Sequence, residues 1–146
     1  RDGKTGDVMI VDDYGHHPAE VEATLDAAQN GFDRRVVVAF QPHRYSRTRD
    51  LFDDFAAVLS GVDALVLTEV YPAGEAPIAG ADAKSLARSI RTRGRVDPVV
   101  VNGAADLRDA LVGVLRDGDL LLMMGAGDIG AAAQQIARTG LQGDNA

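Results

Sequence analysis

Five side chains that can ionise or form hydrogen bonds are crowded into one short turn, Asp12–Pro18, which reads Asp-Asp-Tyr-Gly-His-His-Pro. The turn follows an apolar run, residues 8–11, and precedes a segment with the features of a helix start. Because α/β proteins bind ligands in the loops at the carboxyl ends of strands, this turn is the first candidate site. Asp13 could accept two hydrogen bonds from vicinal ribose hydroxyls, and His16 or His17 could donate to a phosphate or polarise a carbonyl.

Two other interpretations of this turn remain open. Asp12, Tyr14 and His17 could simply close a tight turn through bonds from side chain to backbone. Alternatively, Asp12, Asp13 and His16 could hold zinc or manganese, as in a small metal-dependent phosphoesterase. Neighbouring residues on one turn rarely converge on one ion without ligands from elsewhere, and the sequence has only three histidines. We therefore expect no metal site in this domain.

A second loop, Gln41–Thr48, reads Gln-Pro-His-Arg-Tyr-Ser-Arg-Thr and supplies His43, Arg44 and Arg47. If a helix starts near Ser46, the two arginines flank its first turn, where backbone N–H groups add to the positive field. Guanidinium groups bind carboxylates and phosphates through two parallel bonds, each worth roughly 1.5–3 kcal/mol. The alternative is a solvated basic helix start that pairs with nearby aspartates, but cations at a helix N-terminus oppose the dipole, which favours a ligand.

Two further loops have weaker signals. Gly125–Gly130 is a G-x-G-x-x-G sequence between an apolar run and a helical pattern, but the acidic partner of a dinucleotide site, about 20 residues further on, has no counterpart in the sequence. We interpret it as a glycine turn that lets another group approach the backbone, with Asp128 as a candidate helix cap. The long segment Glu69–Gly80 could wall a pocket or be an ordinary surface loop.

These loops lie between elements that alternate along the sequence. The apolar runs predict strands at residues 8–11, 35–40, 64–68, 98–101 and 120–124, and helical periodicity predicts helices at 18–30, 48–60, 82–93, 104–116 and 129–139. Pro18 suits a first helical position, and Gly31 is placed to cap the far end of that helix. Strands that are apolar on both faces and lead into helices indicate a Rossmann-like three-layer α/β domain with a mostly parallel sheet of about five or six strands. Its strand-end loops would face one edge.

Length and composition limit the function classes. A chain of 146 residues fits one domain, which we place at residues 7–139, with residues 1–7 as a linker or domain boundary and 140–146 as a frayed tail. The net charge of −7 would repel a polyanion, so we expect no nucleic-acid partner. The absence of cysteine excludes disulfides and suits the cytoplasm, and we find no apolar stretch near 18 residues that would suggest a membrane partner.

The motifs together resemble one family. They are the Asp12–Pro18 turn, Phe40–Thr48, Asp63–Leu65, Gly74–Ile78, Gly80–Asp82 and Gly125–Ile129. Over residues 7–139 the sequence is similar to the carboxy-terminal domain of the Mur ligases, ATP-dependent amide ligases of peptidoglycan synthesis. Within that family it looks most like the members that join L-alanine to UDP-N-acetylmuramate. The resemblance implies a third domain that closes over ATP held by a central ATPase domain and brings in the amino acid.

The resemblance also assigns roles to residues. Asp13 and His16 match the family's Asp-x-x-His-x-Pro turn and would contact the ribose and phosphate of ATP, respectively, with Tyr14 bordering the nucleotide or the product. His43, Arg44 and Arg47 would line the alanine and acyl-phosphate site. No G-x-x-G-K-[ST] phosphate loop occurs in the sequence, so magnesium and the triphosphate would be held mainly by the central domain, and this domain alone should be inactive. The alternative is a stand-alone nucleotide-binding or regulatory module without catalysis.

Overall fold

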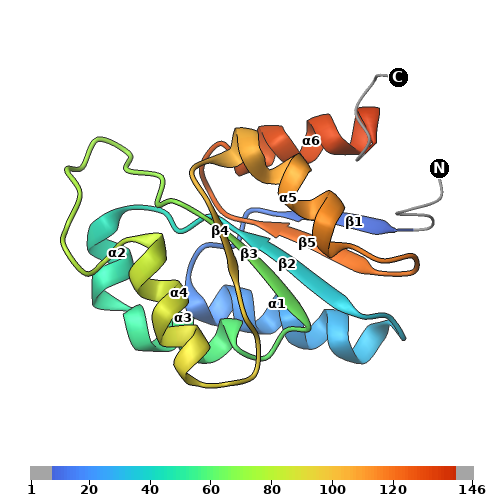
Figure 1. Ribbon diagram of the computed structural model, residues 1–146, viewed down its shortest axis with the longest axis horizontal. Helices are drawn as coiled ribbons and strands as arrows, with labels where there is room; N and C mark the ends of the chain where they lie inside the picture. The colour runs from blue at the N-terminus through green and yellow to red at the C-terminus, as the bar shows by residue number, and fades with distance from the viewer. Residues whose placement is uncertain (1–7, 141–146) are drawn as a thin grey trace.

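The protein is a three-layer α/β domain built on one sheet (Figure 1). The computed structural model describes residues 8–140. Five strands pair in the order β1-β5-β2-β3-β4, and every pairing is parallel. The strands are β1 (Met9–Asp13), β2 (Val36–Phe40), β3 (Ala64–Thr68), β4 (Val99–Val101) and β5 (Leu120–Met124). The expected parallel sheet of five or six strands is therefore confirmed with five.

Helices cover both faces of the sheet. They are α1 (Pro18–Gly31), α2 (Tyr45–Asp50), α3 (Phe52–Leu59), α4 (Ala83–Thr92), the short 3₁₀ helix η1 (Ala104–Asp106), α5 (Leu107–Val114) and α6 (Ile129–Thr139). One apolar cluster joins the sheet to α1, α3 and α4, and a second joins it to α5 and α6. Figure 1 shows these two helix layers on opposite sides of the strands. Within residues 8–140, no helix is long and apolar enough to cross a lipid bilayer.

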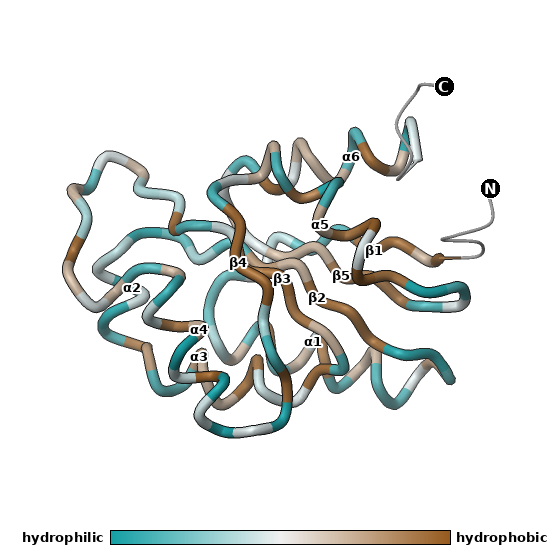
Figure 2. Tube along the Cα trace, viewed as in Figure 1, coloured by the Kyte–Doolittle hydropathy of each residue, from teal (hydrophilic) through white to brown (hydrophobic). Residues whose placement is uncertain are grey.

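The two central strands explain the continuous apolar runs. All five residues of β2 and of β5 are buried, because helices pack on both sides of the sheet. Side chains alternate between the faces: Val36, Val38 and Phe40 join the α1/α3/α4 cluster, whereas Val37 and Ala39 join the other. Figure 2 shows the strands as the hydrophobic centre of the fold. Burial of each Val or Phe stabilises the fold by roughly 1.5–3 kcal/mol.

The helix boundaries differ from the sequence prediction at several points. The helix expected at 48–60 is two helices that meet at Leu51, whose backbone leaves the helical region at φ −116 and ψ 24. Nothing in the local sequence marks this break, because leucine is a good helix former. The helix expected at 104–116 begins as the 3₁₀ turn η1 and ends at Val114. Pro18 does start α1.

The glycine caps also differ. Gly31 was expected to cap α1, but it is the last helical residue, and the cap is Phe32 in extended conformation, whose N–H donates to Ala28 at 3.2 Å. Gly140, which was assigned to the frayed tail, caps α6 at φ +79 and donates its N–H to the Ile136 carbonyl. The expected linker at 1–7 and the tail beyond residue 140 lie outside the described residues.

The glycine turn after β5 packs against the protein itself. A Cβ added to Gly127 would lie 2.5 Å from Oε1 of Gln41 and 2.6 Å from Cγ of Tyr71. Gly125 has φ +148, and its Cβ would lie 2.9 Å from the Gln41 carbonyl oxygen. The third glycine, Gly130, faces open space. The close approach that the sequence suggested is therefore made by Gln41 and Tyr71.

Gln41 also supplies the helix cap that was expected from Asp128. Asp128 occupies the N-cap position of α6 but makes no side-chain cap bond. Instead, Gln41 Oε1 accepts the N–H of Ile129 at 3.1 Å, and Gln41 Nε2 donates to Asp128 Oδ1 at 2.6 Å. The carboxamide is thus satisfied at both ends while the residue is only 3% exposed. It fixes the start of α6 to the end of β2.

We predict that Gly127→Ala destabilises the fold. The added methyl group would overlap Gln41 and Tyr71, and such overpacking costs about 1–3 kcal/mol. Gly130→Ala is the matched control in the same turn, and it should be neutral or slightly stabilising because its Cβ meets nothing within 4 Å. Urea denaturation of both variants measures the free energy of unfolding. Equal stability of the two variants would contradict the packing role of Gly127.

Candidate functional site

The loops that follow β1, β2, β3 and β5 gather at the carboxyl edge of the sheet. His16, after β1, lies 5.9 Å from His43, after β2, between ring centroids. His43 in turn stacks on Tyr71, after β3, at 5.6 Å and an interplanar angle of 12°. Tyr71 packs against Gly127, after β5. The expectation that parallel strands bring these loops to one edge is confirmed.

Asp13 holds the first turn together. Its Oδ1 accepts the Gly15 N–H at 2.7 Å, and its Oδ2 accepts the Thr24 hydroxyl at 3.0 Å. The turn-closing alternative named Asp12, Tyr14 and His17; of these, His17 makes a side-chain to backbone bond, to the Ala19 N–H, and Asp13 makes the others described here. Each carboxylate oxygen has a second lone pair, so these bonds leave Asp13 able to accept from a ligand. Burial and the neighbouring Asp13 carboxylate raise the pKa of Asp12.

The two adjacent histidines have different surroundings. His17 is the N-cap of α1, and its Nδ1 accepts the Ala19 N–H at 3.1 Å. Glu20 Oε1 accepts the N–H groups of His16 and His17, and these two bonds lower the pKa of Glu20. The ring of His16 instead lies edge-on to Tyr14 at 5.6 Å and next to His43. His16 is thus the histidine of this pair that lies toward the second loop, and Tyr14 is 71% exposed beside it.

The second loop starts α2 with an unusual backbone. Arg44 is the N-cap of α2, one residue before Tyr45, and has φ +73. A non-glycine residue in this region is strained by about 1–3 kcal/mol, and such strain is concentrated at functional sites. The conformation is held by the Arg44 N–H, which donates to the Tyr71 carbonyl at 2.8 Å, and by the Arg44 carbonyl, which accepts from the Thr48 hydroxyl at 2.9 Å.

Two polar atoms in this loop are buried and have no protein partner within residues 8–140, namely His43 Nδ1 and Arg47 Nη1. Burial of an unpaired polar group costs roughly 1–3 kcal/mol, and nearly all such groups in native proteins are paired. A ligand could satisfy both atoms. Burial, followed by the charge of Arg47, lowers the pKa of His43, which favours the neutral imidazole at pH 7.

The arginines of this loop do not pair with the aspartates that follow them in sequence. Asp50 pairs with its neighbour Arg49, with Arg49 Nε at 2.9 Å from Oδ1. The acidic group near Arg44 is Glu75, from the segment Glu69–Gly80 that could either wall a pocket or be an ordinary surface loop, at 4.0 Å from Arg44 Nη1. The solvated-helix alternative therefore lacks the ion pairs that it required.

The metal alternative finds no support in the geometry. Among residues 8–140, no group of three or more His, Cys, Asp or Glu side chains is arranged to hold a metal ion. Asp13 contacts Thr24 of α1, and successive side chains of a strand point to opposite faces, so Asp12 is directed toward the other face. The ligand set that a phosphoesterase would need is not brought together.

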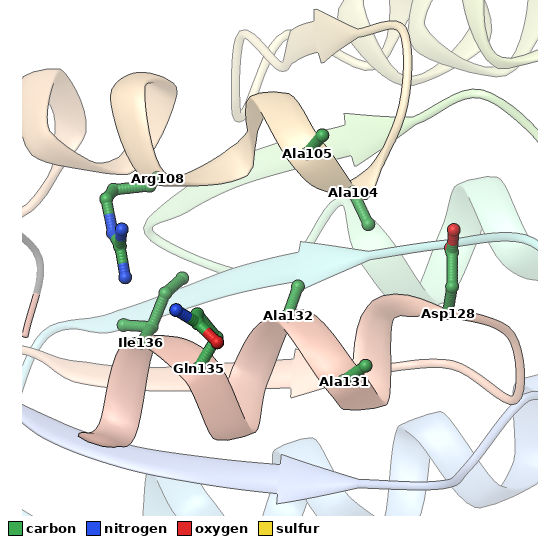
Figure 3. Close-up of a pocket in the computed structure, with 8 residues that line it drawn as sticks. All are labelled: Ala104, Ala105, Arg108, Asp128, Ala131, Ala132, Gln135 and Ile136. Atoms are coloured by element: carbon green, nitrogen blue, oxygen red, sulfur yellow. The ribbon is translucent and has the colours of Figure 1, made fainter. Parts of the chain in front are cut away.

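A separate groove lies outside these loops. A hollow of about 330 Å³ lies between η1, the start of α5, and α6, and its lining includes alanines together with Arg108, Gln135 and Ile136. Figure 3 shows these lining residues. Asp128 and the η1 residues Ala104 and Ala105 are its lining residues that follow carboxyl ends of strands, and none of the sequence-predicted site residues lines it. The sequence did not signal this groove, because alanines on two helices also suit ordinary packing.

The sequence also missed parts of the site itself. Gln41 was quoted only as a loop residue, although a buried amide directly after a fully buried strand is a signal of structural use. Tyr71 and Glu75 belong to the segment Glu69–Gly80, for which the sequence left open a pocket wall or an ordinary surface loop. Their contacts with His43, Arg44 and Ser46 link residues about 30 positions apart, as in the Ser46–Glu75 bond with a separation of 29.

Comparisons with known proteins agree with this architecture. The family model described as "Mur ligase, glutamate ligase domain" matches residues 2–127. A UDP-N-acetylmuramate--L-alanine ligase of Stenotrophomonas maltophilia is 70% identical over 138 residues, which are 94% of this chain and 29% of that protein. An enzyme of the same name from Xanthomonas campestris is 69% identical over 137 residues, 93% of this chain and 29% of its own length. The chain thus spans less than a third of these relatives.

A solved structure has the same fold. A domain described as part of a UDP-N-acetylmuramate:L-alanyl-gamma-D-glutamyl-medo-diaminopimelate ligase from Haemophilus ducreyi superposes with a TM-score of 0.67. The two chains are 17% identical, and each is covered to 94%. This match shows the shared fold, whereas the family model covers most of the sequence. The chain therefore belongs to the Mur ligase family, as its glutamate ligase domain.

Proposed function

We propose that the chain is the carboxy-terminal domain of an ATP-dependent ligase that joins L-alanine to UDP-N-acetylmuramate in peptidoglycan synthesis in the cytoplasm. The observation that carries this proposal is the pair of buried, unpartnered atoms on His43 and Arg47 beside Arg44. They form an anion site at the same edge as the Asp13 turn. The 70% identity to ligases of that name supports the choice of substrates.

The proposed reaction is ligation through an acyl phosphate. ATP supplies the phosphoryl group that activates the muramate carboxylate, and the alanine amine then attacks the acyl carbon and expels phosphate. This chemistry needs positioning and charge neutralisation more than a protein nucleophile. Arg44 and Arg47 would hold the alanine carboxylate and offset the developing phosphate charge, and neutral His43 would bond to the ligand.

The nucleotide would lie against the first turn. Asp13 retains lone pairs for the ribose hydroxyls, and His16 lies between that turn and the second loop. The sequence has no G-x-x-G-K-[ST] phosphate loop, so we assign magnesium and the triphosphate mainly to a central ATPase domain of the same protein. A nucleotide that contacts both domains would stabilise their closed arrangement and cover the exposed Tyr14.

The direct test compares the isolated chain with the full-length ligase that carries it. With ATP, L-alanine and UDP-N-acetylmuramate, the full-length protein should release phosphate, and the isolated chain should release none. The alternative, a nucleotide-binding module without catalysis, predicts micromolar ATP binding by the isolated chain in calorimetry. That result together with an inactive full-length protein would replace the ligase proposal.

Asp13→Ala should raise the KM for ATP in the full-length ligase. Loss of one or two ribose hydrogen bonds of about 1 kcal/mol each predicts roughly a 10-fold increase. Thr24→Val is the matched control, because it removes the internal bond to Asp13 Oδ2 and leaves the carboxylate in place. Steady-state kinetics and thermal melts are measured together. If Asp13→Ala lowers only the melting temperature, then Asp13 closes the turn and does not bind ATP.

Arg47 should be sensitive even to a conservative change. Arg47→Ala should reduce kcat/KM for alanine by roughly 10²-fold, on the order of 3 kcal/mol, in the full-length ligase. Arg47→Lys should also impair it, since an ammonium group cannot reproduce the two-pronged guanidinium contact. Arg49→Ala is the control, because Arg49 is exposed on the same helix and pairs with Asp50. Unchanged alanine kinetics in Arg47→Ala would show that Arg47 does not bind the amino acid.

The pKa of His43 tests the same site in the isolated chain. Burial and Arg47 lower this pKa below 6.5, so Arg47→Ala should shift it upward, while Arg49→Ala should leave it unchanged. The His43 pKa is lower in the folded chain than in the unfolded chain, so the unfolded chain binds the proton at a higher pH. The contribution of His43 therefore makes the fold less stable as the pH falls from 6.5 toward the folded pKa. NMR titration of the imidazole gives the pKa directly. An unchanged His43 pKa in Arg47→Ala would show that the two side chains do not interact.

A further inference from the structure

We propose that Glu75 is a positioning residue of the amino-acid site, whose carboxylate fixes the first turn of α2 and thereby sets the place of Arg44. This inference rests on the proposed function. Glu75 Oε1 accepts the Ser46 N–H at 3.0 Å, and Oε2 accepts the Ser46 hydroxyl at 2.5 Å. The same Oε2 lies 4.0 Å from Arg44 Nη1.

Glu75 caps the N-terminus of α2, which has no cap bond from its own N-cap residue. The first N–H groups of a helix have no partner within the helix. Arg44 stands at the N-cap position, and its side chain makes no cap bond. The carboxylate of Glu75, from a different loop, accepts the N–H of the second helical residue instead. A negative charge at this end of a helix is also favourable for the dipole.

The backbone on both sides of the contact is strained. Among residues 8–140, the non-glycine residues with positive φ are Arg44 at 73° and Ala73 at 50°. Ala73 belongs to the turn that presents Glu75, in which the Glu75 N–H donates to the Pro72 carbonyl at 3.0 Å. Strained conformations persist only where surrounding contacts over-determine them. The Tyr71 carbonyl holds Arg44 from one side and Glu75 holds Ser46 from the other.

The charge of Glu75 favours positioning over the binding of an anionic ligand, because a carboxylate repels another carboxylate or a phosphate. Its two oxygens accept the N–H and the hydroxyl of Ser46, and the side chain is 24% exposed. This charge lies at the N-terminal end of α2, where the carboxylate accepts the Ser46 N–H. An anionic ligand is therefore directed to the unpartnered Arg47 Nη1 and His43 Nδ1, with the 45%-exposed Arg44 beside them. Glu75 would act through the arrangement of this loop and touch no substrate.

The test uses Glu75→Gln and Glu75→Ala in the full-length ligase, with kinetics for alanine and ATP. Glutamine keeps one oxygen for the Ser46 N–H but has neither the charge nor the second acceptor. We expect kcat/KM for alanine to fall about 10-fold in Glu75→Gln and further in Glu75→Ala, with the KM for ATP unchanged. Glu22→Gln, an exposed change on α1, is the control. Thermal melts verify that each variant is folded.

A double-mutant cycle with Arg44→Ala separates positioning from an independent role. If Glu75 acts through Arg44, the double variant should be little worse than Arg44→Ala alone. Losses that multiply would overturn the inference, as would unchanged alanine kinetics in Glu75→Ala while Arg47→Ala remains impaired. Unchanged kinetics in both Glu75→Ala and Arg47→Ala would instead overturn the proposed amino-acid site itself. The two failures are therefore distinguishable.

Discussion

The hydrogen bonds of the Gln41 carboxamide are the interactions on which the arrangement of the site loops depends. The carboxamide is buried between β2 and the start of α6, and its two ends reach the N–H of Ile129 and the carboxylate of Asp128. The backbone N–H of Gln41 donates to the Met124 carbonyl at 3.0 Å, so the chain leaves β2 in a fixed direction. Loss of the carboxamide would leave buried polar groups unpaired at about 1–3 kcal/mol each. Only a glycine at position 127 leaves room for this arrangement.

Next to Gln41, the loops at this edge of the sheet contact one another in a series. Gly127 packs on Tyr71, Tyr71 stacks on His43, and His43 lies beside His16. The result is a continuous row of side chains beside the cationic Arg44 and Arg47, in a chain of net charge −7. Because the overall field repels anions, an anionic ligand must be held by short-range contacts at this row. That requirement is consistent with neutral His43, the unpartnered Arg47 atom and the strained Arg44 backbone.

The sequence predicted the elements better than their contacts. The strands Ala64–Thr68 and Leu120–Met124 were placed correctly, because a buried strand reads as an apolar run between turn residues. The break at Leu51 and the capping by Gln41 were missed, since the first has no local signal and the second joins residues 87 and 88 positions apart. The site residues were gathered at one edge as expected. Which of His16 and His17 faces the second loop could be decided only from the cap geometry of α1, in which His17 is the N-cap.

The strand order has a consequence for how the chain acquires its structure during synthesis. β5 is the last strand in sequence, yet it lies between β1 and β2 and pairs with both. Met9 of β1 pairs with Leu120 of β5, so β1 leaves the ribosome long before its partner strand has been synthesised. Pairing over such separations is slow, and unpaired apolar strands aggregate readily. Until β5 emerges, β1 has no partner strand, and the edge of β2 that pairs with β5 stays open.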